Sequence, residues 1–115
     1  MSKPRIAITM GDPAGIGPEI CLDLLNDPKI SNLCSPIVFG DFSVLRSCAE
    51  KTNKSFDIIE ISENQLGESS QNGIFDLGLM NLNQLNPGTA DANTGRATYG
   101  YVTSAIDACL RNKVD

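Results

Sequence analysis

The chain has 115 residues, of which 41% are hydrophobic, and this length suits one small domain with its own core. Its net charge of −5 and pI near 4.5 argue against nucleic acid as the main partner, because the scattered Lys and Arg residues form no run that could neutralise phosphates. No apolar stretch approaches the ~20 residues that a membrane-spanning helix needs. We therefore expect a cytoplasmic protein without a membrane partner.

The first elements we expect are a strand, a glycine turn and a helix. Apolar, β-prone residues predict a short buried strand over about residues 5–10. A turn with three glycines follows over residues 11–17, and Pro18 stands at the first helical position, which favours proline. Apolar residues then recur at helical spacing and predict an amphipathic helix over residues 18–25. Its apolar stripe contains Ile20, Cys21, Leu24 and Leu25.

The glycine turn has a chemical consequence at the start of this helix. The first N–H groups of a helix lack partners and carry the positive end of its dipole. We expect Gly17 to cap the helix, and without a side chain there a phosphate or carboxylate could approach the backbone. A P-loop is excluded because no lysine lies between Lys3 and Lys29, and the Rossmann fingerprint would need a small residue at Ile20. On these grounds alone, a ligand site and a purely structural turn are equally good interpretations.

Strands and helices continue to alternate through the first half of the chain. The first helix should end before Pro28, because the residue before a proline disfavours helical angles. Asp41 should cap the next helix through its side chain. After the first helix we expect a connector, a strand, a helix and a strand at residues 29–35, 36–40, 42–53 and 56–61. This order predicts an α/β fold, Rossmann-like, with three α/β/α layers and a mostly parallel sheet.

The second half is less regular until its final helix. Residues 62–73 should form a loop and residues 74–77 a short strand. A last helix is predicted over residues 93–112, capped by Asp91 or Asn93. Its apolar face would comprise Tyr99, Val102, Ile106, Cys109 and Leu110. A parallel sheet ending here would keep an unpaired edge and an uncovered helix face, so we expect the chain to be an N-terminal portion.

The four cysteines favour buried thiols over a metal site. They include no C-x-x-C pair, and the chain has no histidine, so a zinc site is not indicated. Cys21, Cys48 and Cys109 fall on apolar faces of predicted helices. We expect them to be free and to pack as small hydrophobic side chains.

The segment Thr9–Glu19, TMGDPAGIGPE, resembles the N-terminal signature of the 4-hydroxythreonine-4-phosphate dehydrogenase family. More distantly, it is similar to the opening loop of isopropylmalate and isocitrate dehydrogenases, and weaker resemblance continues near Gly95-Arg96. It implies that residues 1–115 form the N-terminal part of a two-domain dehydrogenase with an isopropylmalate dehydrogenase-like fold. The resemblance places the following residues at the cofactor: Gly11, Asp12, Gly15, Ile16 and Gly17.

The resemblance also implies the chemistry of the whole enzyme. This would be NAD-dependent oxidation and decarboxylation of 4-hydroxythreonine 4-phosphate in pyridoxal phosphate (vitamin B6) biosynthesis, by a homodimer in which histidines of two subunits hold a divalent metal. Because this chain has no histidine, the metal ligands are expected outside it. No catalytic residue is assigned here, since Asp12 and Glu19 are better explained by turn formation and the helix dipole. The chain alone should be inactive.

Two alternatives remain open at this point. The chain could be a non-catalytic α/β fragment or binding module that keeps the loop without the chemistry. Within the family, it could instead belong to a dehydrogenase of the phosphothreonate type. The residues of the chain do not distinguish the phosphorylated substrates.

Overall fold

The computed structural model describes residues 3–68 and 72–115. Four parallel strands form one sheet in the order β1-β2-β4-β3. The strands are β1 (Arg5–Thr9), β2 (Ser35–Gly40), β3 (Ile59–Glu60) and β4 (Gly73–Asp76). The helices are α1 (Gly17–Leu25), α2 (Pro28–Leu33), α3 (Phe42–Thr52) and α4 (Ala92–Leu110), with a short 3-10 helix η1 (Leu82–Gln84).

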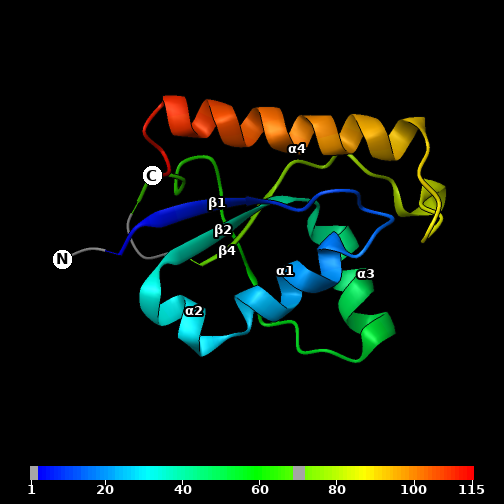
Figure 1. Ribbon diagram of the computed structural model, residues 1–115, viewed down its shortest axis with the longest axis horizontal. Helices are drawn as coiled ribbons and strands as arrows, with labels where there is room; N and C mark the ends of the chain where they lie inside the picture. The colour runs from blue at the N-terminus through cyan, green and yellow to red at the C-terminus, as the bar shows by residue number, and fades with distance from the viewer. Residues whose placement is uncertain (1–2, 69–71) are drawn as a thin grey trace.

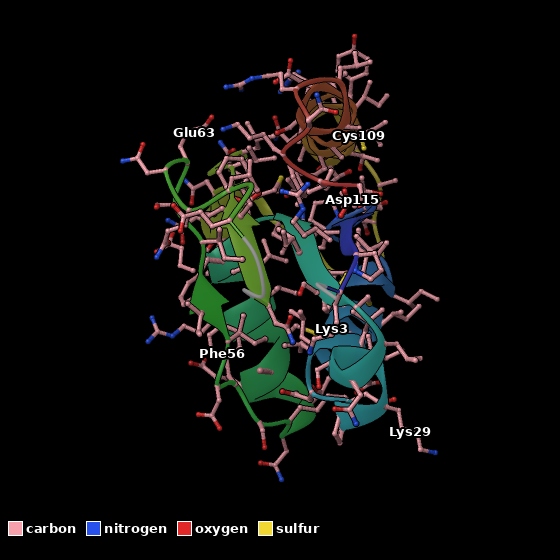
Figure 2. All side chains as sticks on the ribbon, turned by 90° about the vertical axis from the view of Figure 1, so that its left-hand side faces the viewer. Lys3, Lys29, Phe56, Glu63, Cys109 and Asp115 are labelled. Atoms are coloured by element: carbon pink, nitrogen blue, oxygen red, sulfur yellow. The ribbon has the colours of Figure 1, made fainter. Side chains whose placement is uncertain are left out.

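The helices cover the sheet from two sides. Figure 1 shows α4 along one face and α1, α2 and α3 along the other, which confirms the predicted α/β/α arrangement. In Figure 2, the view turned by 90°, Cys109 and Asp115 lie on the β1 side of the molecule and Glu63 on the opposite side. No helix in the described part of the chain is long and apolar enough to cross a membrane.

The core is centred on β2, whose six residues are all buried, as expected of a strand covered on both faces. One apolar cluster lies mainly under α1 and α3 and includes Leu22, Val38 and Leu45. A second cluster joins the sheet to the C-terminal half of α4 and includes Phe39 and Ala105. The sheet is therefore held between two layers of side chains.

The segment after α1 differs from the prediction. The predicted connector over residues 29–35 is in fact mostly the short helix α2. The Asp27 side chain accepts a hydrogen bond from the N–H of Lys29 at 2.9 Å, and Pro28 takes the first helical position. The Asp-Pro pair that ends one helix thus also begins the next.

The third predicted strand, over residues 56–61, is shorter than expected, and the strand that pairs with β2 is β4. Only Ile59 and Glu60 of the predicted 56–61 strand join the sheet. Phe56 instead packs against the ring of Phe42, 5.1 Å between centroids. At the junction of β3 and β4, a Cβ on Gly73 would lie 2.1 Å from the carbonyl oxygen of Ile59, so this pairing requires glycine.

The buried face of α4 is not the one predicted. The predicted residues Tyr99, Val102, Ile106 and Leu110 are between 40% and 79% exposed. The residues that face the protein are Thr94, Ala97, Tyr101, Ala105 and Ala108. Four of these five are small, which lets the helix axis approach the sheet closely. The larger apolar side chains are consequently left on the outside.

The cysteine prediction is confirmed in part. All four cysteines are free, and Cys21 is buried in the core as expected. Cys48 is half-buried, whereas Cys109 is exposed on the outer face of α4, so its predicted burial is wrong. The error has the same cause as the misplaced face of α4.

Candidate functional site

The glycine loop joins β1 to α1 at the carboxyl ends of the parallel strands. Gly11 has a φ of +75°, a left-handed conformation that side chains disfavour. The carboxylate of Asp12 accepts a hydrogen bond from the N–H of Ala14 at 2.8 Å, and Gly15 donates to the carbonyl of Asp12 at 2.9 Å. Asp12 therefore shapes the turn, as its residue type predicts.

Gly17 has a different role from the one predicted. The residue that caps α1 is Ile16, and Gly17 is already helical. A Cβ on Gly17 would lie 2.0 Å from the carbonyl oxygen of Met10, so the residue is glycine because the loop folds back onto the end of β1. Gly15 is under less constraint, since a Cβ there would lie 3.4 Å from the carbonyl oxygen of Asp12. Gly17 is thus explained by packing inside the loop.

The start of α1 retains hydrogen-bonding capacity. Ile16 offers no side-chain cap, and Pro18 has no N–H group. The N–H groups of Gly17 and Glu19 have no acceptor among the described residues. Ile16 is 73% exposed, so this end of the helix lies at the surface. Two backbone donors and the positive end of the helix dipole are consequently available to an anion.

A shallow depression of about 130 Å³ lies beside the loop. Its walls come from the loop, from α3 and from the segment around Pro87. The N–H of Gly88 donates a hydrogen bond to the carbonyl of Ala14 at 2.7 Å and so joins this segment to the loop. The lining is largely apolar, with Ser47, Lys51 and Thr52 of α3 as its polar members. The space would suit a small, partly apolar group next to the loop.

The buried carboxylate of Asp41, which the sequence predicts to cap α3, lies near the same end of the sheet. Asp41 follows β2, and its side chain does not cap α3 as predicted. It accepts hydrogen bonds from the hydroxyl of Tyr101 and from the N–H of Met80, and Asp76 instead accepts from the N–H of Phe42 at 3.0 Å. Burial raises the pKa of Asp41 above its usual value, although the bonds from Tyr101 and Met80 oppose this. The Asp41 side chain thus joins α4 and the segment after β4 to the sheet.

The other acidic and cysteine side chains in the described part of the chain form no cluster that could bind a metal ion. Among residues 3–68 and 72–115, no group of three or more Cys, Asp or Glu side chains is placed to hold a metal ion. The carboxylates at the carboxyl ends of the strands instead bind backbone N–H groups, as Asp12 and Asp76 do. These two carboxylates therefore hold the backbone at the carboxyl ends of the strands.

A comparison with known protein families identifies the family of this chain. Residues 32–115 match the family described as pyridoxal phosphate biosynthetic protein PdxA, which is well over half of the chain. The chain belongs to the PdxA family. The match begins after the glycine loop, so it is independent of the motif that carries the resemblance in the sequence.

Individual PdxA relatives extend the similarity over the loop as well. The chain is 32% identical over 97% of its length to the 4-hydroxythreonine-4-phosphate dehydrogenase of Trichlorobacter lovleyi. It is 33% identical over 99% of its length to a Symbiobacterium thermophilum protein whose name provisionally assigns it as a D-threonate 4-phosphate dehydrogenase. The crystal structure of a 4-hydroxythreonine-4-phosphate dehydrogenase from Burkholderia phymatum superimposes on all of the chain with a TM-score of 0.87 and 29% identity.

The chain is much shorter than these proteins. It spans 34% of the length of the T. lovleyi protein and 35% of the B. phymatum chain. The structure thus presents one part of the PdxA fold, with the glycine loop at the end of its first strand.

Proposed function

We propose that this chain is the N-terminal portion of a two-domain, NAD-dependent dehydrogenase that oxidises and decarboxylates 4-hydroxythreonine 4-phosphate in pyridoxal phosphate biosynthesis. The observation that carries the proposal is the membership of the PdxA family together with a fold that matches a 4-hydroxythreonine-4-phosphate dehydrogenase along the whole chain. The enzyme would act in the cytoplasm as a homodimer. D-threonate 4-phosphate is the second candidate substrate, favoured by the name of the S. thermophilum relative.

In this proposal the chain contributes binding rather than proton or hydride transfer. The outer side of the glycine loop, formed by Gly11, Asp12, Gly15 and Ile16, would contact the cofactor or the substrate phosphate. The free N–H groups of Gly17 and Glu19 fit an anionic group, and the helix dipole would stabilise its charge. The carboxylate of Asp12 would in addition hold the turn, through its hydrogen bond from the N–H of Ala14.

The redox chemistry would come from groups bound mainly by the rest of the protein. When bound, NAD supplies a hydride acceptor, and a divalent metal supplies positive charge beside the developing alkoxide. The metal ligands would lie outside this chain, which has no histidine. The contribution of residues 1–115 would be to position the glycine loop at the edge of that site.

A chimera tests the proposal. Residues 1–115 would replace the aligned portion of the T. lovleyi enzyme, and NADH formation would be followed with each of the two phosphorylated substrates. We expect metal-dependent NADH formation by the chimera and none by the 115-residue chain alone. Preference for one substrate would identify which candidate the complete enzyme uses.

A matched pair of variants controls for folding. Ile16→Asp places a negative charge at the exposed start of α1 and should raise KM for cofactor or substrate by repulsion. Leu33→Asp, at the end of α2 and 71% exposed, places the same charge away from the glycine loop and should leave KM unchanged. A folded chimera that is inactive on both substrates would contradict the proposal, as would equal kinetics of the two variants.

A further inference from the structure

The segment between β4 and α4, residues 77–91, lies at the same end of the molecule as the glycine loop (Figure 1). Two carboxylates hold its first residues. The N–H of Gly78 donates to the Asp76 carboxylate and the N–H of Met80 donates to the Asp41 carboxylate, both at 3.3 Å. The Met80 side chain is buried in the core. The start of the segment is therefore fixed to the ends of β2 and β4.

Helix α4 contacts the same carboxylate and the same segment. The hydroxyl of Tyr101 donates to the Asp41 carboxylate. One residue earlier in the helix, a Cβ on Gly100 would lie 2.4 Å from Cδ1 of Leu79, so the Leu79 side chain packs directly against the helix. The Asp41 carboxylate is consequently enclosed between α4 and the start of the 77–91 segment.

The other end of the segment meets the glycine loop. The N–H of Gly88 donates to the carbonyl of Ala14 at 2.7 Å. Leu85 and Pro87 line the depression beside the loop together with Ala14. Leu85 also packs against the core cluster that contains Met80. The segment is therefore anchored at Met80 and supports the loop at Ala14.

A second path of contacts joins the end of β2 to the start of the loop. Gly40 precedes Asp41, and a Cβ on Gly40 would lie 2.8 Å from both Cβ and Sδ of Met10. Met10 is buried, and its carbonyl oxygen is the atom that excludes a side chain at Gly17. The loop is thus bounded by Met10 on one side and by the 77–91 segment on the other, and the end of β2 contacts both.

We propose that Asp41 is a positioning residue for the glycine loop: with Tyr101 it fixes the 77–91 segment, and this segment sets the place of the loop backbone from Ala14 to Gly17. The role suits a site whose donors are backbone N–H groups, because such donors are aimed only by the path of the chain itself. A displacement of about 1 Å at a binding site can cost on the order of 100-fold in activity.

A purely stabilising role for Asp41 makes a different prediction. General loss of stability acts on amides that exchange through global unfolding, such as that of Val38 in the buried central strand. A positioning role instead predicts local opening of the bond between Gly88 and Ala14. The effect on the loop does not depend on what the loop binds, whereas its consequence for ligand binding rests on the function proposed above.

Two NMR measurements on the 115-residue chain read out this bond: the scalar coupling between the Gly88 nitrogen and the Ala14 carbonyl carbon, and the exchange rate of the Gly88 amide. Asp41→Ala removes the acceptor of both Met80 and Tyr101. We expect it to abolish the coupling and to accelerate exchange at Gly88 on the order of 10-fold more than exchange at Val38.

Two further variants separate positioning from stability. Asp41→Asn keeps an oxygen that can accept from Met80 and should preserve the coupling. Ile61→Ala creates a cavity in the other core cluster and should accelerate exchange at Val38, yet it should leave the Gly88–Ala14 coupling intact. If Asp41→Ala does not fold, Tyr101→Phe takes its place, and we expect exchange at Gly88 to increase more than exchange at Val38.

The chimera described above gives a functional reading. Asp41→Ala should raise KM for cofactor or substrate on the order of 10-fold while kcat changes little, whereas Ile61→Ala should leave KM unchanged. A folded chimera without activity would contradict the proposed function and would leave the role of Asp41 to be decided by the NMR measurements.

Two results would overturn the positioning role. In one, a folded Asp41→Ala or Tyr101→Phe variant accelerates exchange at Gly88 no more than at Val38. In the other, Ile61→Ala abolishes the Gly88–Ala14 coupling as well, which would show that this bond follows general stability.

Discussion

The hydroxyl of Tyr101 donates a hydrogen bond to the carboxylate of Asp41, and both side chains are at most 1% exposed. The bond joins the middle of α4 to the residue after β2, 60 positions earlier in the chain. The same carboxylate accepts from the N–H of Met80 at 3.3 Å. One acidic side chain thus connects three segments at the end of the sheet that carries the glycine loop.

Removal of the Tyr101 hydroxyl should destabilise the fold measurably. Tyr101→Phe keeps the ring but leaves the Asp41 carboxylate with one donor fewer in a buried position, which costs about 1–3 kcal/mol. Urea denaturation would give the change in the free energy of unfolding. Tyr99→Phe is the control, because Tyr99 is 73% exposed and removal of its hydroxyl should lower the free energy of unfolding far less. Equal effects of the two variants would contradict a special role for the buried bond.

The stability of the protein should depend on pH through Asp41. Burial raises the pKa of Asp41 above its ordinary value of 3.8, so the folded protein holds this proton at pH values where the unfolded chain has released it. The contribution of Asp41 is therefore most favourable below pH 3.8 and is lost as the pH rises through the folded-state pKa.

The variant Asp41→Asn isolates this contribution, because it cannot ionise. As the pH is raised from 4 to 7, the free energy of unfolding should fall more for the wild-type protein than for the variant. Other titrating groups are common to both proteins and cancel in the difference. A difference that stays constant across this range would show that Asp41 titrates normally.

The loop glycines should differ in their tolerance of a methyl group. Gly17→Ala forces a Cβ to within 2.0 Å of the Met10 carbonyl oxygen, and relief of this overlap should cost about 1–3 kcal/mol. Gly15→Ala meets its nearest atom at 3.4 Å and should be much milder. Thermal melts of the two variants provide the comparison. If Gly15→Ala proved the more destabilising change, our description of the loop would be wrong.

The cysteines should differ in reactivity. Burial raises the pKa of the Cys21 thiol to about 11, so at pH 8 it is both inaccessible and protonated. Cys109 lies exposed on α4 and should react first with iodoacetamide, as followed by mass spectrometry of the digested protein. In denaturant, both should react at similar rates. Labelling of Cys21 as fast as Cys109 in native buffer would be inconsistent with the packing of α1.

Local signals in the sequence predicted most of the elements. The bounds of β1, β2, α1 and α3 agree with the expected ranges to within one or two residues, because each has a clear apolar period and a nearby proline, glycine or capping residue. The turn-forming role of Asp12 was predicted for the same reason, since its hydrogen bond spans only two residues. The resemblance of Thr9–Glu19 to the dehydrogenase signature pointed to the family that the comparison of residues 32–115 identified.

Contacts between distant segments decided the rest. The periodicity of α4 cannot tell which face meets the sheet, because the small residues that permit close approach, such as Ala105 and Ala108, give a weaker apolar signal than the exposed Ile106 and Leu110. The pairing of β4 with β2 and the hydrogen bond between Asp41 and Tyr101 join segments that are tens of residues apart. The close approach of Gly17 to Met10 comes from the way the loop folds back onto the end of β1. Sequence alone therefore determined which segments form helices and strands, whereas the tertiary structure determined which surfaces they bury, since burial depends on neighbours that no local pattern specifies.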